Sequence, residues 1–108
     1  MRLIYDTIYL QVRAARQAIE KHHPDRIMTL GGDCLIDLSP MDYLNRRYAG
    51  NLGVLWLDTH PDVLTLKDSY QGNEYVLAAL FGRGDPELVE EVDMPIQPSH
   101  VMYAGLDT

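Results

Sequence analysis

The sequence predicts an α/β fold built on a parallel sheet of about three strands. Segments with helical periodicity alternate with short apolar runs, and this alternation is typical of strand–helix–strand crossovers. The runs are apolar at nearly every position, as in strands that are buried on both faces. The 108 residues suffice for one small domain and not for two, so we expect a single domain over residues 1–108.

The first helix and the first strand are predicted over residues 4–22 and 26–30. Apolar residues recur at helical spacing in the first segment, and they are Ile4, Ile8, Val12, Ala15 and Ile19. Pro24 ends the helix because proline cannot continue it. The second segment is short and apolar and stops at Gly31, as a buried strand would.

The second helix and the second strand are predicted over residues 38–48 and 52–57. Ser39 is a suitable N-cap, Pro40 suits the first helical position, and Gly50 marks the end of the helix. The following run is apolar on both faces and therefore predicts a buried strand.

The remaining elements follow a polar, irregular segment over residues 58–72. Residues 73–81 predict a third helix, closed by Gly82, and residues 86–92 predict one or two further helical turns. Residues 100–105 predict a third strand. The predicted order is therefore helix and strand, repeated three times.

This order leaves the predicted sheet incomplete. Three parallel strands have two long edges, and about three helices are too few to cover both faces of the sheet. We therefore expect either the middle part of a larger α/β domain or a chain that completes its sheet by pairing with another copy.

Charge and hydropathy argue against several classes of function. Nine Lys and Arg residues against sixteen Asp and Glu give a net charge of −7, which disfavours nucleic-acid binding. The longest apolar runs are far shorter than the roughly 20 residues that cross a bilayer, so we expect no membrane association. Asp6 lies where a signal peptide would be apolar, and the single cysteine, Cys34, excludes an internal disulfide, so we expect a cytoplasmic protein.

Candidate metal ligands follow the predicted strand over residues 52–57, at the edge where open parallel sheets bind ligands. Asp58, His60 and Asp62 alternate, so an extended backbone would direct all three side chains to one side. Two carboxylates and an imidazole suit a divalent cation such as Mn²⁺, Fe²⁺ or Zn²⁺. The alternative is a polar turn with solvated carboxylates, and spacing alone does not decide between the two.

Asp33 and Cys34 follow the predicted strand over residues 26–30 in the same way. Gly31 and Gly32 precede them and allow a tight turn. A Cys34 thiolate would bind zinc or iron well and manganese less well. The alternative is that Cys34 is a small buried apolar side chain, which is the commoner state of a free cysteine.

Together these segments resemble the ureohydrolase superfamily, whose members include arginase, agmatinase and formiminoglutamase. Leu30-Gly31-Gly32-Asp33-Cys34 is similar to the family's Gly-Gly-Asp-His motif, and Asp58-Thr59-His60-Pro61-Asp62 is similar to its Asp-Ala-His-x-Asp motif. Residues 76–85 resemble the helix that follows, so the resemblance covers residues 10–107. It implies a three-layer α/β/α fold with a larger parallel sheet, of which this chain holds an incomplete part.

The resemblance also implies a cofactor and a reaction. Members of the family use two Mn²⁺ ions to activate a water that attacks the carbon of a guanidinium or amidine group, and urea or a related amide leaves. By position, Asp58 would bridge both ions, while His60 and Asp62 would each bind one. Asp33 would support the neighbouring groups.

The sequence departs from the family pattern in three places. Cys34 stands where the family has a histidine, and Asn73 stands where a second histidine often assists proton transfer, which asparagine cannot do by titrating. The family's later Ser-x-Asp-x-Asp motif, which supplies further carboxylates, is not reached by Thr108. The resemblance therefore implies at most half of a two-metal site.

Two functions from different classes are consistent with these patterns. The first is part of a manganese-dependent hydrolase that cleaves C–N bonds of guanidino or amidino compounds, inactive as these 108 residues alone. The second is a non-catalytic α/β module that self-associates through its open sheet edges. The expected partners are accordingly a small substrate, the remainder of the domain or a second copy.

Overall fold

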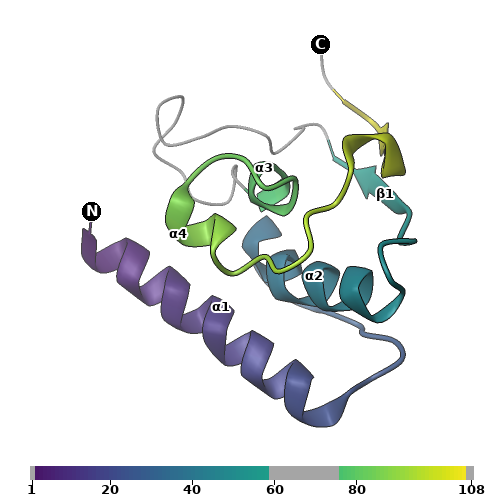
Figure 1. Cartoon of the computed structure of the whole chain (residues 1–108). Coiled ribbons are helices and arrows are strands. Elements are labelled where there is room, and N and C mark those ends of the chain that lie inside the picture. The colour runs from purple at the N-terminus through teal and green to yellow at the C-terminus, as the bar shows by residue number, and fades with distance from the viewer. Residues whose placement is uncertain (1, 59–75, 107–108) are drawn as a thin grey trace.

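The computed structural model describes residues 2–58 and 76–106, which form an α/β fold (Figure 1). Its helices are α1 (Arg2–His22), α2 (Leu38–Arg47), α3 (Val76–Leu80) and α4 (Pro86–Val89). Two short 3-10 helices are η1 (Cys34–Asp37) and η3 (Pro98–His100). The two strands are β1 (Val54–Leu57) and β2 (Val101–Ala104).

The strands β1 and β2 form a parallel sheet in which Val54 lies opposite Val101 and Leu57 lies opposite Ala104. Parallel pairing needs a crossover connection, and α3 and α4 lie on that connection. These strands confirm the positions predicted over residues 52–57 and 100–105, whereas the predicted burial of both faces of the first is wrong, because Leu55 and Leu57 are exposed.

The predicted helices are also confirmed wherever the structure describes them. Residues 59–75 lie outside the described residues, so the irregular segment and the start of the third helix stay predictions. Gly50 and Gly82 follow α2 and α3 with φ of 81° and 80°, the left-handed conformation that suits glycine at a helix end. Their amides donate to the carbonyls of Asn45 and Ala79, respectively, in the last turn of each helix.

The start of α2 differs from the prediction that Ser39 is its N-cap. The chain already turns in η1, so the helix begins at Leu38 and Asp37 occupies the N-cap position. The Ser39 hydroxyl instead donates a hydrogen bond to the carbonyl of Val12 in α1, at 2.9 Å. This buried bond joins the first two helices.

The strand predicted over residues 26–30 is wrong for this chain. These residues form no ladder, and the side chains of Met28 and Leu30 are 88% and 89% exposed. A strand forms only where a neighbouring strand satisfies its backbone groups. Within the described residues β1 pairs with β2 alone, so the sheet has two strands where three were predicted.

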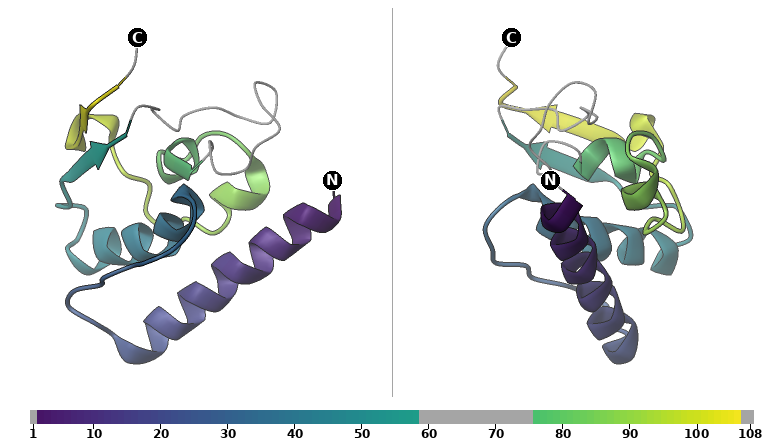
Figure 2. Two further views of the ribbon diagram at one scale, coloured as in Figure 1. Left: turned by 180° about the vertical axis from the view of Figure 1, so that it is seen from behind. Right: turned by 90° about the vertical axis from the view of Figure 1, so that its left-hand side faces the viewer.

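Among the described residues, the helices α1 to α4 lie on the same side of the sheet (Figures 1 and 2). Accordingly Val54 and Trp56 are buried, whereas Leu55 and Leu57 on the opposite face of β1 are exposed. Every side chain of α3 is buried, and each fully buried leucine contributes about 1.5–3 kcal/mol to folding. The described residues therefore supply two layers of the three-layer arrangement, an incomplete fold as expected.

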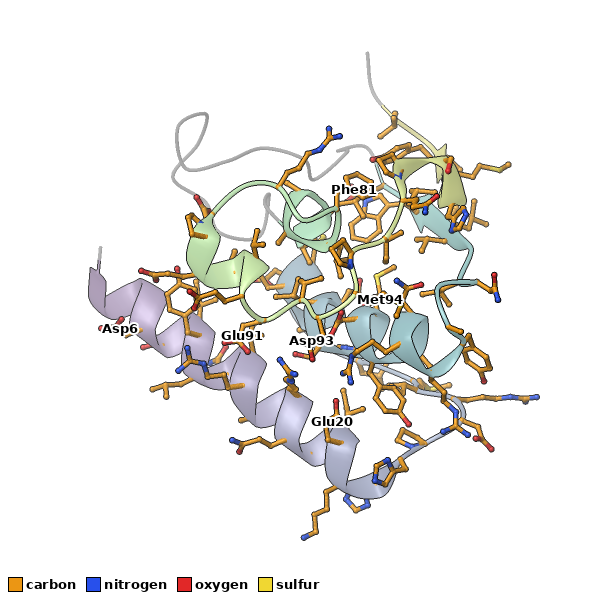
Figure 3. All side chains as sticks on the ribbon, viewed as in Figure 1. Asp6, Glu20, Phe81, Glu91, Asp93 and Met94 are labelled. Atoms are coloured by element: carbon orange, nitrogen blue, oxygen red, sulfur yellow. The ribbon has the colours of Figure 1, made fainter. Side chains whose placement is uncertain are left out.

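A buried carboxylate connects α2 to the chain that leads to β2. Asp42 is 1% exposed, and its Oδ1 accepts hydrogen bonds from the backbone amides of Asp93 and Met94, both at 3.0 Å. Its Oδ2 accepts from Arg46 Nε at 3.1 Å. Asn45 Nδ2 donates to the carbonyl of Met94 at 2.9 Å. Figure 3 shows Asp93 and Met94 on the segment that passes over α2.

Ion pairs fasten α1 to the same segment. Arg13 Nε lies 2.7 Å from Glu91 Oε1, and Arg16 pairs with Asp93. Glu91 is itself buried, so Arg13 and Arg16 offset the cost of removing its carboxylate from water.

In the part of the chain that the structure describes, no helix is apolar enough over sufficient length to cross a membrane.

We expect Asp42→Ala to lower the free energy of unfolding by about 3 kcal/mol, because two backbone amides and a guanidinium lose their buried partner. Urea denaturation followed by circular dichroism measures this change. Asp25→Asn is the control, since Asp25 is an exposed carboxylate paired with Arg47 and should change stability by less than about 0.5 kcal/mol. Equal effects of the two substitutions would contradict this role for Asp42.

Candidate functional site

Asp58 lies directly after β1, at the carboxyl end of the sheet. Its amide donates to the carbonyl of Ala104 at 3.1 Å, so the β1–β2 pairing fixes its backbone. Gly105 has φ of 91°, and a Cβ added there would lie 3.4 Å from the Asp58 carbonyl oxygen. The glycine therefore permits the close approach of the two strand ends. In the sequence, the signal for this contact is the glycine that ends the strand predicted over residues 100–105.

Cys34 is the first residue of η1, and its position is fixed by the residue before it. Asp33 is the N-cap of this 3-10 helix, and its Oδ1 accepts a hydrogen bond from the amide of Leu35 at 3.0 Å. Cys34 is half-buried and packs against the apolar core. Asp33 thus supports the turn that presents the thiol.

The structure brings Cys34 and Asp58 together. Cys34 Sγ lies 3.7 Å from Asp58 Oδ2, although the two residues are 24 positions apart in the sequence. Both side chains are half-buried, so they share a partly desolvated position at the end of β1. A thiol and a carboxylate that meet in this way offer one sulfur and one oxygen donor to a cation.

The other predicted site residues lie outside the described residues. They are His60, Asp62 and Asn73. Across residues 2–58 and 76–106, no three His, Cys, Asp or Glu side chains gather into a metal-binding group. The ligand roles of all these residues, including Cys34 and Asp58, therefore stay predictions.

A separate open groove of about 400 Å³ lies between α1 and residues 27–40. Most of its lining is apolar and comes from residues such as Ile8, Ile19 and Ile27. Asp33 is the one acidic or basic residue among the described residues that line it. Neither Cys34 nor Asp58 faces this groove, so it is distinct from the candidate metal site.

The parallel sheet with helices packed on one face defines an α/β protein, a class in which ligands commonly bind at the carboxyl ends of the strands. A comparison with known protein families shows which family of this class the chain belongs to. The Arginase family model matches residues 3–108, and the chain belongs to the arginase family.

The curated relatives include bacterial and amoebal arginases. Arginase of Bacillus subtilis (strain 168) is 37% identical over 90 residues, which are 80% of this chain and 29% of that protein. Arginase of Staphylococcus aureus (strain MRSA252) is 33% identical over 81 residues, 73% of this chain and 26% of that protein. The chain therefore spans little more than a quarter of the length of these relatives.

Solved arginase structures have the same fold. The Entamoeba histolytica arginase, crystallised in complex with L-ornithine, matches with a TM-score of 0.78 and 28% identity. The match covers 94% of this chain and 36% of that chain. The Bacillus subtilis arginase matches with a TM-score of 0.69 and 27% identity. These similarities confirm an arginase-like α/β fold that is incomplete in this chain.

Burial raises the pKa of the Asp37 carboxyl, at the end of η1. A carboxyl with a raised pKa in the folded state binds its proton more tightly there than in the unfolded chain. Its contribution to stability is therefore present below the unfolded pKa, about 4, and is lost as the pH rises through the folded pKa.

We accordingly expect Asp37→Asn to increase the melting temperature, relative to the unsubstituted chain, more at pH 7 than at pH 4. The amide cannot ionise, so it avoids the cost of burying a charge at neutral pH. Thermal unfolding followed by circular dichroism at the two pH values tests this. A gain that is the same at both, or larger at pH 4, would show that the burial of Asp37 has no such cost.

Proposed function

We propose that this chain supplies part of the metal site of an arginase-like hydrolase that cleaves C–N bonds of guanidino or amidino compounds. The observation that carries the proposal is the 3.7 Å contact between Cys34 Sγ and Asp58 Oδ2. This contact joins two segments that resemble motifs of the family, residues 30–34 and the start of residues 58–62, near the carboxyl end of β1, where parallel sheets bind ligands. Membership of the arginase family supports the same reaction class.

The donor atoms on this edge fit a divalent cation. The Asp58 carboxylate and the Cys34 thiolate are both metal ligands in proteins, and both lie on backbone that is held by hydrogen bonds. His60 and Asp62 are the further donors that the sequence predicts. Manganese, the ion that the family resemblance implies, would lower the pKa of a bound water and polarise the substrate carbon.

The residues of the chain itself would position the ion and the substrate. Asp58 would hold its carboxylate at the sheet edge through the backbone bond to Ala104, and Asp33 would keep η1 in the conformation that presents Cys34. The chain spans little more than a quarter of its curated relatives, so we propose that the complete reaction needs donors from outside these residues.

We expect the purified chain to retain about one divalent ion after dialysis against Mn²⁺ or Zn²⁺, and Asp58→Asn to lose it, because the amide cannot offer an anionic ligand. Elemental analysis gives the stoichiometry. Asp25→Asn, which changes an exposed carboxylate elsewhere, is the matched control and should retain the ion. Urea release from L-arginine, assayed in parallel, should be absent unless the remaining donors are supplied.

The metal-site proposal fails if the chain binds no ion, or if Asp58→Asn binds as much as the unsubstituted chain. Far-UV circular dichroism of each variant shows that lost binding is not lost folding.

A second candidate function, self-association as a non-catalytic module, is favoured by the uncovered face of the sheet. Leu55, Leu57 and Met102 are exposed on the side away from the helices, and Leu55 lies opposite Met102 in the ladder. Parallel strands are ordinarily covered on both faces. A second copy of the chain, carrying the same apolar face, would remove these side chains from water.

We expect the chain to sediment as a dimer or larger species at micromolar concentration, and Leu55→Lys to shift it to the monomer by placing a charge in the apolar contact. Leu10→Lys is the matched control, because Leu10 on α1 is similarly exposed, at 66% against 59% for Leu55. A monomeric unsubstituted chain, seen by analytical ultracentrifugation, would argue against the module.

A further inference from the structure

We draw no further inference here: the strongest candidate, the open apolar groove between α1 and residues 27–40, carries none, because nothing among the described residues shows what covers it.

Discussion

The buried carboxylate of Asp42 sets how the segment before β2 packs against α2. It binds two consecutive backbone amides and a guanidinium, and so it holds the segment before β2 against α2. Burying an ionised carboxylate is costly, and these three partners offset the cost. The position of β2 follows from this anchor, and the position of Asp58 follows from β2 through the backbone bond to Ala104.

A sheet covered on one side accounts for the exposed apolar residues of the chain. Leu55, Leu57 and Met102 face away from the helices, and Met28 and Leu30 lie on a segment without a ladder partner. In a larger parallel sheet such residues contact further strands and helices. The match with a solved arginase covers 36% of that chain, so these residues correspond to the smaller part of that fold.

Periodicity predicted the helices α1 and α2, and the apolar runs predicted the places of β1 and β2, but the burial of both faces of β1 that its run predicted is not found, because Leu55 and Leu57 are exposed. The segment over residues 26–30 was mispredicted because a strand also depends on a partner that a pattern within the segment does not encode. Asp42 was missed as a core residue because aspartate is ordinarily exposed. Its position four residues before Arg46 was the available signal. The structure places Cys34 beside Asp58 although the strand predicted before Cys34 does not form, and the ligand roles of both residues stay predictions; His60, Asp62 and Asn73 lie outside the described residues.

We propose that Cys34 and Asp58 act together as ligands of one ion. The most direct measurement is the X-ray absorption spectrum of the zinc-loaded chain at the zinc K-edge. We expect a sulfur atom at about 2.3 Å from zinc, lost in Cys34→Ser. A spectrum with only oxygen or nitrogen neighbours at about 2.0–2.2 Å would contradict it, because the thiol would then have no part in the site.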